Sequence, residues 1–297
     1  MSNATDSARN NLTIRPLGAA LGAEVTGIDL AGPLDDDTLA AVQRAWMEHL
    51  VLVFPNQPLS DAQHISFAKR FGALEEHHQE IIKSRAAPEI FSVSNVDDDG
   101  NLMAPDHPSV AQISLAQRWH SDSSFRPVPS LGSILHGIEV TEDGGETWFT
   151  NMYKVYDGLD EATKVRIAGR RACHDFGHLA TLGPIKPLTE AERQAMPPVW
   201  QPLVRSHPIT ERTCLFLSPI YNNAIEGMDE DEAVELVAEL NEFAGRDEFV
   251  YRHRWSRDDI VMWDNRCTMH RATPYDLATR RVMHRTTVIG KGPVVAA

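Results

Sequence analysis

The last third of the chain carries the feature that most limits its fold, an alternation of side chains with a period of two. Between residues 249 and 255, Phe249, Tyr251, His253 and Trp255 alternate with Val250, Arg252 and Arg254. This alternation is typical of a half-buried strand, because successive side chains of a strand point to opposite faces. Further strands are expected at residues 50–54, 89–96, 260–263 and 281–288. Antiparallel strands in this number predict a β-sandwich or a jelly roll.

Helical spacing of apolar residues occurs elsewhere in the chain. Helices are expected at residues 35–50, 60–70, 153–168 and 229–244. Residues 104–118 are rich in proline and polar residues and have no period, so they are expected to form a binding loop or a lid. The predicted fold class is therefore mainly β with flanking helices, as a jelly-roll core with helical insertions.

The sequence shows no sign of a boundary between two domains. The chain contains no internal repeat and no Gly/Ser-rich or Pro-rich linker. Residues 1–10 are polar and are expected to form a flexible N-terminal tail. Residues 11–297 are expected to form a single domain, since this length can bury a substantial core.

Charge and cysteine usage exclude several classes of partner. The net charge of −14 argues against nucleic acid and anionic membrane surfaces as partners, and the longest apolar runs are too short to span a bilayer. The three cysteines are widely spaced and odd in number, which argues against a disulfide framework or a structural zinc site. With no apolar signal segment in the polar N-terminus, these features predict a cytoplasmic protein.

Two candidate metal ligands occur in Trp119-His120-Ser121-Asp122. On an extended segment, His120 and Asp122 point to the same face and can bind one metal ion. Taken alone, this pattern also fits an aspartate that hydrogen-bonds a nearby histidine. His270 is the best candidate for a third ligand, because it follows an expected strand and the turn-like Asp264-Asn265-Arg266. Two histidines and one carboxylate suit non-haem Fe(II) oxygenases, although zinc hydrolases use the same set.

Two arginines follow within the last expected strand. Arg281 and Arg285 would share one face with Met283. If that face is exposed, the arginines only increase solubility; if it is buried, each requires an anion. Arginine binds carboxylates through two parallel hydrogen bonds, so one could bind a dicarboxylate cosubstrate and the other an anionic substrate. Thr147, after the glycine turn Gly144-Gly145, could supply a hydroxyl partner.

Taken in order, these motifs resemble a known family. The set comprises Trp119-His120-x-Asp122, Gly144-Gly145-x-Thr147, Trp263-Asp264-Asn265-Arg266, His270 and Arg281-x3-Arg285. It is similar to the TauD/TfdA family of Fe(II)- and 2-oxoglutarate-dependent dioxygenases, which have a double-stranded β-helix (jelly-roll) core. The resemblance extends from Gly22-Ala23-Glu24-Val25-x-Gly27 to the last strand, which is nearly the whole chain.

The resemblance implies a role for each matching residue. His120, Asp122 and His270 would bind Fe(II), and Thr147 and Arg281 would bind 2-oxoglutarate. Arg285 would face the anionic group of the substrate or help to position the cosubstrate. His77 and Tyr221 fall at substrate-binding positions. The implied reaction uses O2 to convert 2-oxoglutarate into succinate and CO2 while a substrate carbon next to a heteroatom is hydroxylated.

The substrate class is the finest prediction. Segments such as residues 191–198 and 248–255 look closer to the 2,4-dichlorophenoxyacetate type than to taurine dioxygenases. Where taurine enzymes have a Ser-Phe pair, this chain has Leu179-Ala180, which predicts a more apolar pocket. The 2,4-dichlorophenoxyacetate enzymes have histidines in the stretch that matches residues 221–224, and this chain lacks them.

We therefore expect a small anionic substrate, of the aryloxyalkanoate class, whose ether cleavage gives a phenol and an oxo acid. The alternative within the same chemistry is a taurine, alkylsulfonate or alkyl sulfate dioxygenase. A third class is a metal-binding jelly roll without oxygenase activity, but such a protein would have no use for the dicarboxylate site of Arg281 and Thr147. Family members often self-associate, so a homo-oligomer is expected from the resemblance alone.

Overall fold

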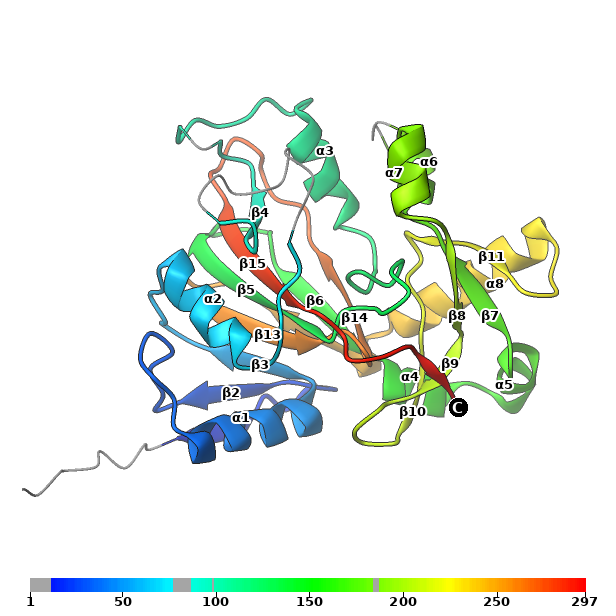
Figure 1. Ribbon diagram of the computed structural model, residues 1–297, viewed down its shortest axis with the longest axis horizontal. Coiled ribbons are helices and arrows are strands. Elements are labelled where there is room, and N and C mark those ends of the chain that lie inside the picture. Colours follow the sequence, from blue (N-terminus) through cyan, green and yellow to red (C-terminus); the bar gives the residue numbers. More distant parts are fainter. Residues whose placement is uncertain (1–11, 77–86, 98, 184–186) are drawn as a thin grey trace, which may run out of the picture.

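The computed structural model describes residues 12–297 except 77–86, 98 and 184–186 (Figure 1). The predicted tail at residues 1–10 and the predicted substrate-binding residue His77 lie outside the described residues. The described part of the chain is mainly β with several helices, as the sequence predicted. No helix in the described ranges combines the length and the apolar character that crossing a membrane requires.

A large sheet forms one wall of the core. In the described part of the chain it has seven strands in the order β1-β2-β3-β13-β5-β15-β4, antiparallel except for the β2–β3 pair. The strands are β1 (Thr13–Pro16), β2 (Ala23–Thr26), β3 (Val51–Phe54), β4 (Phe91–Ser94), β5 (Gly132–Glu139), β13 (Ile260–Asp264) and β15 (Val282–Val288). Residues far apart in the sequence thus meet at the centre of one sheet.

Three smaller sheets complete the β structure of the described residues. The sheet β12-β6-β14 consists of β12 (Val250–His253), β6 (Thr147–Asn151) and β14 (Thr268–Ala272). The other two are β10-β9-β16 and β11-β7-β8. Their strands are β7 (Arg171–His174), β8 (Val199–Pro202), β9 (Val204–Ser206), β10 (Thr213–Leu215), β11 (Asn222–Ile225) and β16 (Val295–Ala296).

The helices begin at polar residues that cap them. Asp35 caps α1 (Asp36–His49), a capping box of Ser60 and Gln63 starts α2 (Asp61–Lys69), and Asp229 caps α8 (Glu230–Ala244). The remaining helices are α3 (Pro108–Leu115), α4 (Met152–Gly158), α5 (Glu161–Ile167), α6 (Leu179–Leu182), α7 (Glu190–Ala195) and the 3-10 turns η1 (Phe176–His178) and η2 (Asp247–Phe249). In Figure 1, α1 and α2 cover one face of the large sheet.

The two faces of the large sheet bury two different cores. Ile134 and Met262 belong to a core that also contains residues of α1 and α2, whereas their neighbours Leu135 and Trp263 belong to a second core. This second core includes Phe149 of β6, so the sheet β12-β6-β14 faces the large sheet. The switch from one core to the other between consecutive residues follows from the two-residue period of a strand, because both faces of this sheet are covered.

Two sequence predictions were wrong. Residues 104–118 are not irregular throughout, because α3 begins at Pro108, where the missing proline N–H costs nothing, and the side chain of His107 caps it. The single helix expected at residues 153–168 is two helices. α4 ends at Gly158, and Asp160 caps the first turn of α5.

Candidate active site

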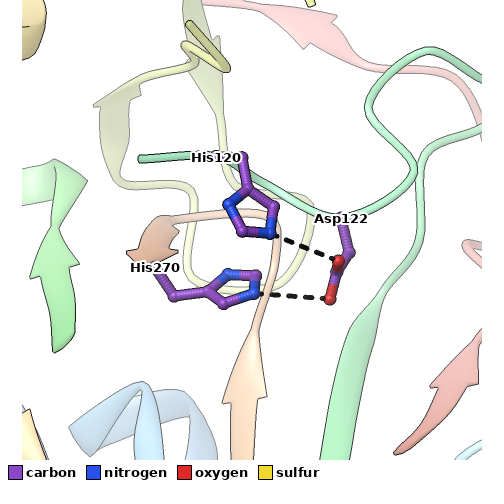
Figure 2. A group of neighbouring side chains, drawn as sticks. All are labelled: His120, Asp122 and His270. Carbon is purple, nitrogen blue, oxygen red and sulfur yellow. Dashed lines mark ion pairs between the residues drawn. The ribbon is translucent and has the colours of Figure 1, made fainter. Parts of the chain in front are cut away.

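His120 and His270 lie side by side because their backbones pair. The N–H of His120 donates to the carbonyl oxygen of His270 at 3.0 Å, and the N–H of His270 donates in return at 2.8 Å. Their ring centroids are 4.2 Å apart. Asp122 lies two residues beyond His120 and points toward both rings (Figure 2). All three side chains are buried, so the structure brings together the three predicted ligands.

Lone pairs of the three side chains converge on one point. His120 Nδ1 lies 2.8 Å from the carbonyl oxygen of Arg118, which assigns the proton to Nδ1 and leaves a lone pair on Nε2. The Nε2 atoms of His120 and His270 lie 3.9 Å and 3.8 Å from the two carboxylate oxygens of Asp122. These distances are too long for hydrogen bonds. Since metal–nitrogen bonds are about 2 Å long, ligand atoms about 3–4 Å apart suit a single divalent ion between them.

The protonation states also suit a metal ion. Burial lowers the pKa of His120 and, more strongly, that of His270, so both imidazoles are neutral at pH 7. Burial alone would raise the pKa of Asp122, but the positive charge of Arg285 and then the two histidines outweigh it, and the pKa is lowered. Neutral imidazoles and an ionised carboxylate are the forms that bind metals.

Asp122 is held by residues of two adjacent strands of the large sheet. Ser133 Oγ of β5 donates to Asp122 Oδ2 at 2.7 Å, and Arg285 Nη1 of β15 donates to Oδ1 at 2.6 Å. The guanidinium of Arg285 also lies 4.4 Å from the centroid of the Phe91 ring. Arg285 is therefore not a solvent-exposed solubilising residue but a mostly buried cation, with a side chain 14% exposed, beside the three candidate ligands.

Arg281 is a second buried cation, and it lies just before β15. Its side chain is 3% exposed, and burial lowers its pKa to about 10. Nη2 donates to the carbonyl oxygen of Gly145 at 3.0 Å, and the guanidinium lies 5.4 Å from the Tyr275 ring centroid. Among the described residues, no carboxylate lies within 4.0 Å of it. A buried guanidinium without a carboxylate is costly unless a ligand supplies an anion.

The glycine turn before β6 makes room for Arg281. Gly145 has φ +65, and a Cβ atom there would lie 2.7 Å from Thr141 Oγ1 and 3.0 Å from Arg281 Nε, so any other residue would displace the guanidinium. Two residues later, the buried Thr147 accepts a hydrogen bond from Trp255 Nε1 at 3.0 Å. Arg281 therefore contacts the short turn that leads into Thr147, the other predicted cosubstrate residue.

Aromatic residues line the next segment of the chain after Asp122. Phe125 packs against Tyr221 and Phe176, with ring centroids 5.0 Å and 4.6 Å away. Leu179 belongs to the same apolar cluster. An apolar environment was predicted here because Leu179-Ala180 stands where taurine enzymes have a Ser-Phe pair. Because Phe125 lies three residues after Asp122, its contact with Tyr221 brings this cluster near the three ligands. Burial and the charge of Asp122 raise the pKa of the Tyr221 phenol.

Three polar residues around the site were given no role from the sequence. Asn265 Nδ2 donates to Ser133 Oγ at 2.9 Å, and Ser133 in turn donates to Asp122. Glu75 is buried and accepts a hydrogen bond from Ser123, the residue after Asp122. Asn265 lies within the motif Trp263-Asp264-Asn265-Arg266, so its role could have been predicted from the sequence. Ser133 and Glu75 stand in no sequence pattern that distinguishes them from other serines and glutamates.

A second group of potential ligands lies close to the first. Ligand atoms of His207, Asp264 and Cys267 are within 4.8 Å of one another, and all three residues are buried. Arg266 donates to both oxygens of Asp264, at 2.8 Å and 2.6 Å. His207 Nδ1 accepts hydrogen bonds from the backbone N–H of Thr210 and its neighbour, so its proton is on Nε2, 3.2 Å from Asp264. Every potential ligand atom of this group except the thiol therefore already takes part in a hydrogen bond within the protein.

Comparisons with known proteins agree with this geometry. Residues 13–287 match the taurine catabolism dioxygenase TauD, TfdA family. The chain is 39% identical to the alpha-ketoglutarate-dependent 2,4-dichlorophenoxyacetate dioxygenase of Cupriavidus pinatubonensis, over 94% of this chain and 98% of that protein. It is 37% identical to the (S)-phenoxypropionate/alpha-ketoglutarate-dioxygenase of Delftia acidovorans, over 95% and 97%. The crystal structure of AAD-2 in complex with Mn(II) and N-oxalylglycine is similar, with a TM-score of 0.88 and 38% identity over 96% of this chain and 100% of that chain.

Proposed function

This chain belongs to the TauD/TfdA dioxygenase family, and from that premise we propose that it cleaves the ether bond of aryloxyalkanoates. It is an oxidoreductase that depends on Fe(II), 2-oxoglutarate and O2. We assign residues 11–297 to one domain whose two facing sheets form a double-stranded β-helix. We also assign it to the reducing cytoplasm, because Cys173, Cys214 and Cys267 are free and buried.

The proposed ligands of the iron are His120, Asp122 and His270. The bound iron, with 2-oxoglutarate as a chelating cosubstrate, would activate O2 for hydroxylation of the substrate carbon. A site with three protein ligands would leave coordination positions for the cosubstrate and O2. Ser133 and Arg285 orient the carboxylate of Asp122, and Arg118 fixes the tautomer of His120.

The observation that carries the cosubstrate assignment is the buried guanidinium of Arg281, which has no carboxylate nearby in the described residues. A dicarboxylate can bind the metal ion with its keto acid end and Arg281 with its distal carboxylate. Thr147 is proposed to donate a hydroxyl hydrogen bond to that carboxylate. The glycine turn at Gly145 keeps the guanidinium in place for this contact.

The substrate is proposed to bind between Arg285 and the aromatic cluster. Arg285 would pair with the carboxylate of the substrate, and Phe125, Phe176 and Tyr221 would pack against its aryl ring. Hydroxylation of the carbon that bears the ether oxygen gives a hemiacetal, which breaks into a phenol and an oxo acid. Succinate and CO2 leave as the products of the cosubstrate. His77 remains a predicted substrate contact.

Two matched arginine variants test these roles. Arg281→Leu should raise the KM for 2-oxoglutarate about ten- to a hundredfold and change the KM for the substrate little, because a charge-assisted hydrogen bond contributes about 1.5–3 kcal/mol. Arg285→Leu should do the reverse. Equal effects of both variants on both KM values would refute the assignment.

A substrate panel tests the reaction itself. Succinate formation should be stimulated by phenoxyacetates and phenoxypropionates, and the matching phenol and oxo acid should accumulate in equal amounts. Stimulation by alkylsulfonates or alkyl sulfates alone would overturn the substrate class but not the dioxygenase chemistry. The iron assignment would be overturned if anaerobic mixing with Fe(II) and 2-oxoglutarate gave no visible charge-transfer band and if no succinate formed in air.

A further inference from the structure

Glu75 is a buried carboxylate that the proposed reaction does not use. Its side chain is 5% exposed. The segment that ends at Glu75 runs along β15: Leu74 bridges Val288, and the N–H of Glu75 donates to the carbonyl oxygen of Thr287 at 2.8 Å. Glu75 therefore lies beside the strand that carries Arg285.

The carboxylate of Glu75 contacts the turn that follows Asp122. Ser123 Oγ donates to Glu75 Oε2 at 2.8 Å, and Arg126 Nε lies 3.3 Å from the same oxygen. Ser123 has φ +52, and its carbonyl oxygen accepts a hydrogen bond from the N–H of Arg126. Glu75 thus joins a tight turn on the substrate side of the candidate metal ligands.

Four charges are gathered at this place. Asp122 and Arg285 form one ion pair at 2.6 Å, and Glu75 and Arg126 form another. The guanidinium of Arg126 lies 5.7 Å from the Phe125 ring centroid, and Phe125 packs against Tyr221 at 5.0 Å, so the second pair lies beside the aromatic cluster. Among the described residues, the charges of these two pairs cancel before any ligand binds.

The cancellation fixes the charge that a substrate can bring. In the proposed function, divalent iron and dianionic 2-oxoglutarate also cancel, since the two histidines are neutral. Arg281, which has no carboxylate partner among the described residues, then leaves one positive charge in this sum. A substrate with a single carboxylate neutralises the site, whereas a dianion would leave a buried negative charge, which is unfavourable.

We propose that Glu75 determines the charge class of the substrate, by balancing Arg126 so that monoanions are accepted and dianions are rejected. This inference rests on the proposed function. Without the charge of Glu75, the site would have one more positive charge and would tolerate a second anionic group. Charges several ångströms apart in a partly buried site interact strongly enough to change affinity about tenfold per charge.

The test compares ligands that carry no, one and two negative charges. Phenoxyacetamide, phenoxyacetate and 2-phenoxysuccinate are titrated calorimetrically at pH 8 into protein saturated with Mn(II) and N-oxalylglycine, so that no turnover occurs. Glu75→Gln is the informative variant, because the glutamine oxygen can still accept the hydrogen bond of Ser123. We expect its Kd to be unchanged for the neutral amide, about tenfold lower for the monoanion and about a hundredfold lower for the dianion.

Two control variants separate charge from structure. Ser123→Ala removes the hydrogen bond and keeps the charge, so it should leave the ratio of the three Kd values as in the wild type. Glu139→Gln removes a partly exposed carboxylate that pairs with Arg280 on the same sheet, and it should also leave the ratio unchanged.

The outcomes that contradict the inference are distinct from those that contradict the proposed function. The role of Glu75 alone would be overturned if Glu75→Gln changed the Kd of all three ligands equally or changed none of them. It would also be overturned if Ser123→Ala showed the same charge dependence as Glu75→Gln. Failure of all three ligands to bind the wild-type protein would overturn both the inference and the proposed substrate class.

Discussion

Two buried groups of potential metal ligands lie near each other and differ in what their ligand atoms contact. In the group of His120, Asp122 and His270, the two Nε2 lone pairs face the carboxylate at distances too long for hydrogen bonds. In the group of His207, Asp264 and Cys267, Arg266 and the histidine proton occupy both carboxylate oxygens. Similar residue types thus form an open group in one place and a closed group in the other.

The difference teaches that hydrogen bonds, more than residue types, decide whether a buried group can bind a metal ion. A metal ion at the closed group would have to displace an arginine and a histidine proton, which would leave buried charges unpaired. The closed group instead supports the open one. Asn265, between Asp264 and Arg266, donates to Ser133, which donates to Asp122. We therefore expect substitutions in the closed group to affect stability and those in the open group to affect activity.

The largest effect is expected from Asp264→Asn. The substitution leaves Arg266 and His207 buried without their partner, so the free energy of unfolding should fall by about 3–5 kcal/mol. Chemical denaturation measures this change. Asp247→Asn, at an exposed pair with Arg252, is the matched control and should cost less than about 1 kcal/mol. A loss below 1 kcal/mol in Asp264→Asn would mean that the closed group does not stabilise the fold.

The next effect separates the two histidine types. His270→Gln removes a proposed ligand and should lower kcat/KM more than about a hundredfold, since even residues that only support metal ligands account for 10- to 100-fold. His207→Gln should lower the free energy of unfolding by about 1–3 kcal/mol and leave kcat/KM of the folded protein within a few fold. Steady-state kinetics and denaturation on both variants check this, and an equal loss of activity in both would remove the distinction.

A smaller effect concerns a third histidine that belongs to neither group. His64 of α2 is fully buried, its Nδ1 has no hydrogen-bond partner among the described residues, and burial lowers its pKa from 6.5 to about 3. His136, His284 and Asp61 face it. The unfolded chain binds a proton below pH 6.5 while the folded chain does not, so stability falls as the pH decreases from 6.5 toward 3.

For His64 alone this loss is about 1.4 kcal/mol at pH 5.5 relative to pH 7.5. His64→Gln should remove that part of the pH dependence, as measured by the free energy of unfolding at the two pH values. The activity at pH 7.5 should stay close to that of the wild type, because His64 does not contact the open group. An unchanged pH dependence would show that His64 is not the titrating residue.

Much of the open group could be predicted from the sequence because it depends on local patterns. The spacing of His120 and Asp122 predicted that both could bind one metal ion, and His270 was chosen because it follows an expected strand. In the structure His270 lies on β14, where its backbone pairs with that of His120. The sequence placed Arg281 and Arg285 on one face with Met283, and the structure buries Arg281 fully and Arg285 mostly. An apolar environment near Leu179 was predicted because Leu179-Ala180 stands where taurine enzymes have a Ser-Phe pair.

The features that could not be predicted from the sequence depend on contacts between distant segments of the chain. The pairing of Arg285 with Asp122 joins residues 163 positions apart, and that of His207 with Asp264 joins residues 57 apart. Helix α3 was missed because proline was interpreted as a break in a pattern, although at the first position of a helix it is favourable. Glu75 is one of many glutamates, and only its burial beside Ser123 sets it apart.

The number of Mn(II) ions bound per chain tests the central comparison most directly. Equilibrium dialysis followed by elemental analysis should give one ion in the wild type, one in Cys267→Ala and none in His270→Gln. This result would locate the metal ion at the open group and leave the closed group without one. Two ions in the wild type, or loss of the ion in Cys267→Ala with its retention in His270→Gln, would contradict the account.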